Sequence, residues 1–211
     1  MCGIFLVYSK VSNLKLDKVN CIASAKKMRN RGPDILKYQF FENERLFLAN
    51  SVLSLTGTYS KSQKLICSEN RRKKIIYNGE IYNYKKLNNR YFKNKNFKND
   101  TSLIVNMYEK FNFDIPKKFN GMFAYVVYDQ FKKNFEAVVD PQGEKTLFYY
   151  NDENYFIISS TIKSLVFFLK KKNIEKESLK NYFRTRHFIL NPQNIFENIA
   201  TLYNGFKIHF E

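Results

Sequence analysis

The chain has 211 residues, of which 44% are hydrophobic and 17% aromatic, and this composition excludes a disordered or collagen-like protein. No run approaches the roughly 18 apolar residues that a transmembrane helix needs. The 36 basic and 19 acidic side chains give a net charge of +17, but the basic residues are scattered in short groups. We therefore attribute the charge to compositional drift, and expect neither a membrane nor a nucleic-acid partner.

The three cysteines, Cys2, Cys21 and Cys67, are an odd number and form no metal-type pairs. We expect no disulfide framework and no metal site, and a reducing cytoplasm is the expected compartment. Only two histidines are present, which leaves little room for a zinc site or a Ser-His-Asp triad. No linker rich in Gly, Ser or Pro divides the chain, so we expect a single domain over residues 1–211.

Apolar runs predict strands along most of the chain. The first, residues 3–8, is continuously apolar, as in a strand that is buried on both faces. The other predicted strands cover residues 37–41, 46–53, 65–67, 74–77, 122–128, 135–139, 147–150 and 155–159. Helical periodicity predicts helices over residues 14–29, 82–91, 101–111, 161–169 and 174–184, the third with Asp100 as its N-cap. Strands flanked by helices indicate an α+β fold with layered sheets.

Cys2 is the first candidate for chemistry. If an aminopeptidase removes Met1, Cys2 becomes the terminal residue and presents a thiol beside a free α-amine. These two groups ordinarily have pKa values of about 8.5 and about 7.7–8.0, so one residue can hold a nucleophile and its general base without a histidine. The alternative is that Cys2 only begins a buried strand.

Further motifs follow in a fixed order along the chain. They are Arg31-Gly32-Pro33-Asp34, Asn78-Gly79-Glu80-Ile81-Tyr82-Asn83, Asn99-Asp100-Thr101, Asn120-Gly121-Met122-Phe123-Ala124-Tyr125 and Asp140-Pro141-Gln142-Gly143-Glu144-Lys145. Together with Cys2-Gly3-Ile4, they resemble the class II glutamine amidotransferase domain, the amino-terminal half of glutamine-hydrolysing asparagine synthetases. The resemblance covers essentially the whole chain. It implies an Ntn-hydrolase-like fold, an αββα sandwich of two antiparallel sheets between helical layers.

The resemblance also implies a reaction, the hydrolysis of L-glutamine to glutamate and ammonia. Cys2 would attack the side-chain amide of glutamine, and the oxyanion would lie against the Asn78 side chain and the Gly79 N–H. Glu80 and Asp100 match positions that hold the substrate, with Asp100 pairing the α-ammonium group.

Arg31 matches a family residue that helps to order the active-site terminus. The residues by themselves leave two other interpretations open. Asn78-Gly79 is also a typical hairpin turn, and Asp100 is also a plain helix N-cap.

One position departs from the family pattern. Val52 occupies the place of an arginine that binds the glutamine α-carboxylate in the family, so a substrate-binding position lacks its charge. A charge-assisted hydrogen bond is worth about 1.5–3 kcal/mol, and its loss weakens binding about 10- to 150-fold unless Arg45 or Lys64 substitutes. The alternative function is therefore a catalytically impaired interaction or regulatory module.

The sequence contains no SGGxDS-type or Walker-type phosphate loop. We therefore expect no cofactor in this domain, with ATP bound only at an absent synthetase domain, and no asparagine synthesis by the chain alone. The ammonia would pass to a separate synthetase protein or to a missing C-terminal domain. The sequence leaves open the ammonia acceptor, the removal of Met1 and whether the chain forms a homo-oligomer.

Overall fold

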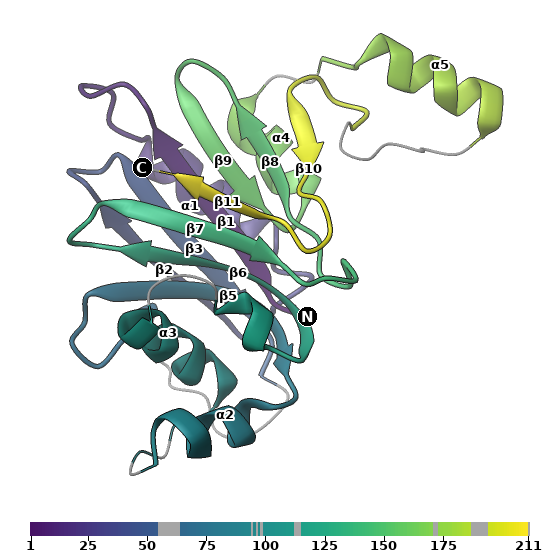
Figure 1. The fold of residues 1–211 in the computed structure, drawn as a ribbon. Coiled ribbons are helices and arrows are strands. Elements are labelled where there is room, and N and C mark those ends of the chain that lie inside the picture. The colour runs from purple at the N-terminus through teal and green to yellow at the C-terminus, as the bar shows by residue number, and fades with distance from the viewer. Residues whose placement is uncertain are drawn as a thin grey trace. The chain divides into compact units, whose positions relative to one another are not determined.

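The computed structural model describes residues 1–54, 64–93, 95, 97, 99–111, 115–170, 173–186 and 194–210. The chain divides into two compact units, each with its own antiparallel sheet (Figure 1). The first unit comprises Met1–Gln63 and Thr146–Tyr203, and the second comprises Lys64–Lys145 and Asn204–Glu211. The single-domain organisation expected from the lack of a linker stays a prediction.

The first unit contains a six-stranded sheet in the order β10-β8-β9-β1-β3-β2. Its strands are β1 (Gly3–Ser9), β2 (Ile35–Phe41), β3 (Leu46–Val52), β8 (Phe148–Asn151), β9 (Tyr155–Ser159) and β10 (Ile199–Thr201). Its helices are α1 (Lys18–Lys26), α4 (Ile162–Leu169) and α5 (Lys176–Thr185). β1 pairs with β3 on one side and with β9 on the other, so the amino-terminal strand is held along both edges.

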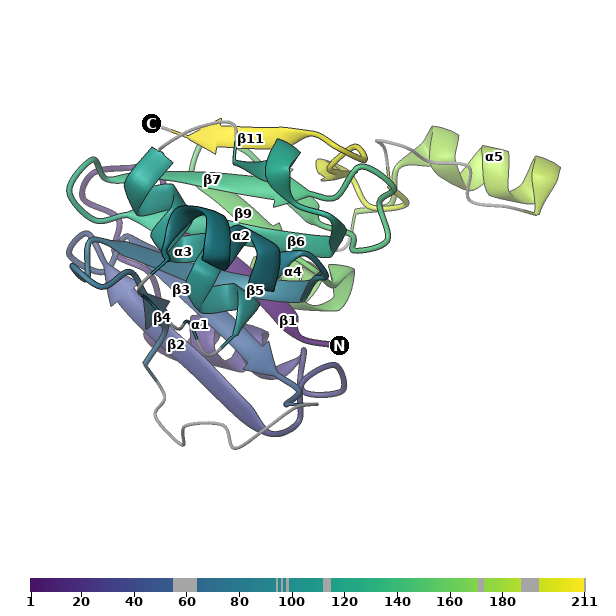
Figure 2. The same cartoon turned by 60° about the horizontal axis from the view of Figure 1, so that its bottom comes forward.

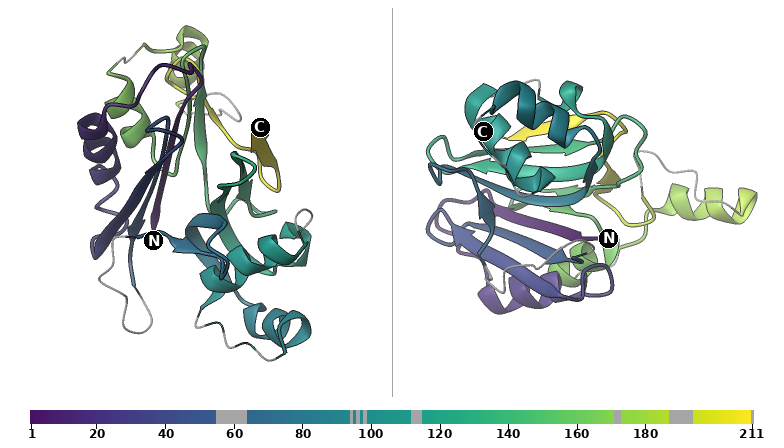
Figure 3. Two further views of the ribbon diagram at one scale, coloured as in Figure 1. Left: turned by 90° about the vertical axis from the view of Figure 1, so that its left-hand side faces the viewer. Right: turned by 90° about the horizontal axis from the view of Figure 1, so that it is seen from below.

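Helices α1 and α4 lie side by side over one face of this sheet (Figure 3). Phe5 and Val7 of β1 belong to the hydrophobic core under these helices. Ile4 and Leu6 alternate with them and therefore lie on the other face, and all four side chains are fully buried. This burial confirms that residues 3–8 form a strand buried on both faces.

The second unit contains a five-stranded sheet in the order β11-β7-β6-β5-β4. Its strands are β4 (Ile66–Cys67), β5 (Lys73–Ile81), β6 (Gly121–Asp129), β7 (Asn134–Val139) and β11 (Lys207–Phe210). Its helices are α2 (Tyr84–Tyr91) and α3 (Asp100–Phe111), with a short 3-10 turn at Pro116–Lys118. Figure 2 shows α2 and α3 lying across one face of this sheet, where Leu103 and Met107 of α3 share a hydrophobic core with Phe123 of β6.

The predicted strands and helices are all present, with some different bounds. The helix predicted over residues 14–29 begins only at Lys18, because the Asp17 carboxylate caps it by accepting from the Val19 and Asn20 N–H groups. β10 and β11 were not predicted, since an alternation over three or four residues is too short to recognise. Among the described residues, no helix combines the length and apolar character needed to cross a bilayer.

Candidate active site

Cys2 lies directly before β1 in the first unit. Its sulfur accepts a hydrogen bond from the Leu53 N–H at 3.5 Å and lies 3.8 Å from the Leu53 carbonyl oxygen. Cys2 is half-buried, whereas Cys21 is fully buried in the core under the helices. Burial raises the pKa of Cys21 to about 12, so this thiol stays protonated at neutral pH and is unreactive.

Arg31 lies beside the same terminus. Its Nη1 donates to the Ser160 carbonyl oxygen at 2.7 Å, and its Nη2 lies 3.6 Å from Met1 Sδ. Ser160 Oγ accepts from the Ile4 N–H at 2.9 Å, and the Ser160 N–H donates to the Ile4 carbonyl at 3.0 Å. Burial lowers the pKa of Arg31 and the charge of Cys2 opposes this shift, so the guanidinium remains a cation next to Cys2. These bonds tie Arg31 to the backbone that carries Cys2.

Val52 ends β3 and directly precedes Leu53, whose backbone contacts the Cys2 sulfur. The position that lacks the expected arginine is therefore next to the predicted nucleophile. Arg45 does not replace that arginine, because it lies at the other end of β3, where its guanidinium donates to the Tyr8 hydroxyl at 3.2 Å. At roughly 3.3 Å per residue, the seven steps from Arg45 to Val52 amount to about 23 Å.

Asn50 has a structural role that the sequence did not predict. Its side chain is only 8% exposed and donates to the Gly3 carbonyl oxygen at 2.8 Å. The neighbouring Ser51 hydroxyl donates to the Gly32 carbonyl at 2.6 Å. These two bonds connect β3 to the start of β1 and to the segment that follows Arg31. A polar residue inside a run as apolar as β3 is the signal that could have identified Asn50.

In the second unit, Asn78 and Gly79 lie within β5 and pair with Ala124 and Phe123 of β6. The interpretation of this dipeptide as a hairpin turn is therefore wrong. Asn78 is 1% exposed, so its side-chain amide is buried. Gly79 is required by close packing, because a Cβ at this position would lie 2.2 Å from the Met122 carbonyl oxygen.

Asp100 is the first residue of α3, and its predicted role as N-cap is wrong. Asn99 caps the helix instead, since its Oδ1 accepts from the backbone N–H three residues later at 2.9 Å. Asp100 Oδ2 accepts from the Tyr77 hydroxyl at 2.6 Å and from the Ile81 N–H at 3.0 Å. These two residues bracket residues 78–80, so the carboxylate of Asp100 fixes the segment of β5 that carries the predicted site.

Asp140 is a further buried carboxylate, to which the sequence motif assigned no role. It is 1% exposed and follows directly after β7. Its two oxygens accept hydrogen bonds from four backbone N–H groups. The donors and their N···O distances are Phe123 (3.2 Å), Gln142 (3.0 Å), Glu144 (3.1 Å) and Lys145 (3.0 Å). Phe123 pairs with Gly79, so this carboxylate also fixes the strand segment opposite the predicted site.

Replacing Asp140 with alanine is expected to lower the free energy of unfolding by at least about 3 kcal/mol. The change leaves four backbone donors without their acceptor, and an unsatisfied buried donor costs about 1–3 kcal/mol. Urea unfolding measures the loss, and Glu153→Ala, which removes an exposed carboxylate, is the matched control. Equal unfolding free energies for the two variants would show that the four hydrogen bonds contribute nothing.

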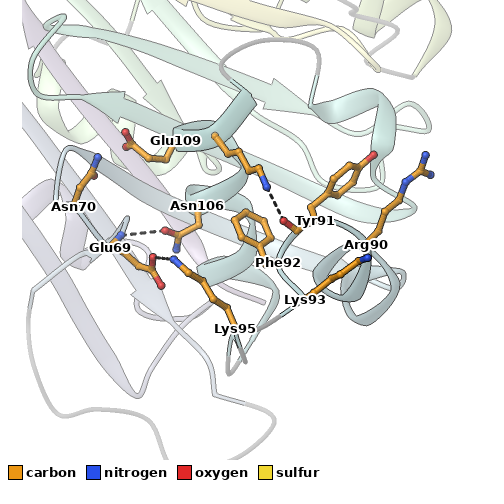
Figure 4. Close-up of a pocket in the computed structure, with 10 residues that line it drawn as sticks. Glu69, Asn70, Arg90, Tyr91, Phe92, Lys93, Lys95, Asn106 and Glu109 are labelled. Atoms are coloured by element: carbon orange, nitrogen blue, oxygen red, sulfur yellow. Dashed lines mark hydrogen bonds and ion pairs between the residues drawn. The ribbon is translucent and has the colours of Figure 1, made fainter.

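A cavity of about 630 Å³ lies in the second unit beside α2, α3 and the connection from β4 to β5 (Figure 4). On one side the Glu69 N–H donates to Asn106 Oδ1 at 3.1 Å, and on the other Lys110 Nζ donates to the Tyr91 carbonyl at 2.7 Å. None of the residues predicted for glutamine hydrolysis is among the described residues that line it. The cavity is therefore separate from the predicted site.

The predicted residues thus fall into two groups, one in each unit. At one end of the first unit's sheet lie Cys2, Arg31 and Val52. Along or against β5 in the second unit lie Asn78, Gly79, the exposed Glu80 and Asp100. Their roles in catalysis stay predictions.

Two synthetase relatives match nearly the whole chain. A Methanocaldococcus jannaschii protein named as a glutamine-hydrolysing asparagine synthetase is 32% identical over 222 positions, which cover 96% of this chain and 42% of that protein. Asparagine synthetase [glutamine-hydrolyzing] 1 of Bacillus subtilis is 29% identical, over 97% of this chain and 33% of that protein. The chain therefore spans less than half the length of these relatives.

Among solved structures, the glutamine phosphoribosylpyrophosphate amidotransferase of Bacillus subtilis matches with a TM-score of 0.61 and 14% identity. The match covers 79% of this chain and 43% of that one. At this identity the likeness concerns the fold, and it confirms the predicted α+β fold of the Ntn-hydrolase amidotransferases. The family model of the glutamine amidotransferase domain matches residues 1–211. The chain therefore belongs to the glutamine amidotransferase domain family, as its motifs predicted.

Proposed function

We propose that this chain hydrolyses L-glutamine to glutamate and ammonia. The observation that carries the proposal is the match of residues 1–211 to the glutamine amidotransferase domain. The half-buried sulfur of Cys2 supports it, because a nucleophile must be reachable by its substrate. The cation of Arg31 close to this sulfur also supports it, since a neighbouring positive charge favours the thiolate.

In the proposed reaction, Cys2 is the nucleophile and becomes the terminal residue when Met1 is removed. Its α-amine takes the thiol proton while the sulfur bonds to the side-chain carbonyl carbon of glutamine. The oxyanion that forms accepts hydrogen bonds from the Asn78 side chain and the Gly79 N–H. The carbon–nitrogen bond then breaks, and the amine returns its proton to the departing ammonia. Water hydrolyses the thioester, which releases glutamate and restores the thiol.

Glu80 and Asp100 are the proposed contacts for the substrate, with Asp100 pairing its α-ammonium group. Glu80 is exposed on β5, so its carboxylate is available to a ligand. Asp100 already accepts from Tyr77 and Ile81, and it would pair the ammonium through the lone pairs that these bonds leave. Asp100 is thus proposed to act both on the substrate and on the position of β5.

We further propose that the ammonia is used by an asparagine-synthetase-like domain or partner protein. The relatives that support this idea are named as asparagine synthetases, and the chain covers only their glutamine amidotransferase part. ATP would be bound by that partner domain and not by the residues of this chain. The reaction of this chain alone would therefore end at glutamate and ammonia.

The test is to incubate the purified chain with L-glutamine and to measure both products, with intact mass spectrometry to establish whether Met1 is present. We expect equal amounts of glutamate and ammonia from the form without Met1. We expect neither product from a form that retains Met1, because the nitrogen of Cys2 is then part of a peptide bond and cannot act as the base. Lack of both products from the form without Met1 would contradict the proposal and favour the interaction module suggested by Val52.

A further inference from the structure

One face of the first unit's sheet carries a row of three side chains across three neighbouring strands. Ile4 of β1 lies opposite Asn50 of β3, and Asn50 lies opposite Lys37 of β2. Leu36 and Tyr38, which flank Lys37, pack against the core under α1 and α4. Because side chains alternate along a strand, Lys37 lies on the face that turns away from these helices.

This row lies next to the position that lacks an arginine. Val52 follows Asn50 by two residues on the same face of β3, and its direct partner on β2 is Ile35. Lys37 is therefore the diagonal neighbour of Val52, and diagonal neighbours lie about 7–8 Å apart. Diagonal neighbours at this spacing are within reach of a long side chain such as that of lysine.

Lys37 has no counter-ion within the part of the chain that the structure describes. Its ammonium forms no hydrogen bond or ion pair there, although the residue is half-buried. Burial lowers the pKa of Lys37 because no neighbouring carboxylate compensates for the lost solvation. A half-buried charge without a partner is unfavourable, and an anion bound beside it relieves that cost.

Two other cations near β1, Arg31 and Arg45, are already engaged. Arg31 donates to the Ser160 carbonyl, and Arg45 donates to the Tyr8 hydroxyl far from Val52. Among the described residues, Lys37 is thus a cation of this face whose charge is available to a ligand.

We propose that Lys37 binds the α-carboxylate of glutamine and so supplies the charge that Val52 lacks. This inference rests on the proposed glutamine hydrolysis and assigns the amino-acid end of the substrate to a residue on β2. The contact forms when the substrate binds and is kept in the transition state. Its loss should therefore raise KM and leave kcat nearly unchanged.

The experiment compares Lys37→Met with wild type in steady-state glutamine hydrolysis. We expect KM for glutamine to rise roughly 10- to 150-fold, the range of one charge-assisted hydrogen bond, with kcat changed by less than about twofold. Lys37→Arg should stay close to wild type because it keeps the cation. Lys163→Met removes the same charge from an exposed site on α4, over the opposite face of the sheet, and should leave KM unchanged.

A second substrate separates the carboxylate contact from a general change in the pocket. 4-Aminobutanamide is glutamine without its α-carboxylate, so its KM should be the same for wild type and Lys37→Met. An unchanged KM for glutamine in Lys37→Met would overturn the inference and leave the proposed function intact. Equal increases for both substrates would overturn it too, because a change in pocket shape affects both.

If the wild-type chain hydrolyses no glutamine, calorimetric titration with glutamine replaces the kinetic assay. Binding to wild type that Lys37→Met weakens at least tenfold would support Lys37 as the carboxylate ligand while the proposed reaction fails. Binding of equal strength to both chains, or binding to neither, would overturn the inference.

Discussion

Replacing Cys2 with alanine is expected to reduce glutamine hydrolysis by at least about 10⁴-fold while the fold is retained. Loss of the nucleophile removes the covalent route, and comparable losses in other nucleophilic enzymes are of this order. The side chain is small, half-buried and directly before β1, so its removal should change the melting temperature little. Ammonia release and thermal unfolding measure the two effects separately.

The controls for Cys2 are the two other cysteines of the chain. Cys21→Ala and Cys67→Ala should retain activity, since Cys21 is a buried thiol with a raised pKa and Cys67 lies in the short strand β4. A thiol reagent added at neutral pH should modify Cys2 and spare Cys21. Equal ammonia release from Cys2→Ala and wild type would remove Cys2 from the mechanism.

Replacing Gly79 with alanine is expected to destabilise the protein by about 3 kcal/mol and to reduce activity at least about 10²-fold. The added methyl group would lie 2.2 Å from the Met122 carbonyl oxygen, so β5 and β6 must move apart where they pair. That movement displaces the Gly79 N–H, one of the two proposed oxyanion donors, and loss of one such donor costs about 10²–10³ in rate.

The matched control for Gly79 places an alanine elsewhere in β5. Lys74 is a half-buried residue of this strand, opposite Tyr128, and Lys74→Ala introduces no backbone clash. Its unfolding free energy should change by less than about 1 kcal/mol and its activity should be retained. If Gly79→Ala unfolds at the same urea concentration as Lys74→Ala, the close approach of Met122 does not constrain this strand.

The sequence predicted the elements whose signals are local. The continuous apolar run of β1 and the periodic apolar residues of α3 suffice to identify them. The extension of β5 through Asn78-Gly79 was not predictable in this way, because the dipeptide is typical of a turn when only its neighbours in sequence are considered. Pairing with β6, about 45 residues later, keeps this segment extended.

The candidate site, like the fold, was predictable from the sequence only where its signals are local. Cys2 and Asn78 belong to recognisable motifs, and the structure shows where each lies. The separation of Arg45 from Val52 follows from the extended strand between them, which the sequence predicted over residues 46–53. The four donors that converge on Asp140 and the placement of Lys37 beside Val52 depend instead on contacts between segments distant in sequence.

The position of β1 between β3 and β9 has a consequence for the thiol just before it. Chain ends are ordinarily the most mobile part of a protein. Here the end continues a strand whose amide hydrogens are protected by neighbours along both edges, so these hydrogens should exchange with solvent only when the sheet itself opens. The proposed nucleophile is thereby attached directly to a strand that is held along both edges.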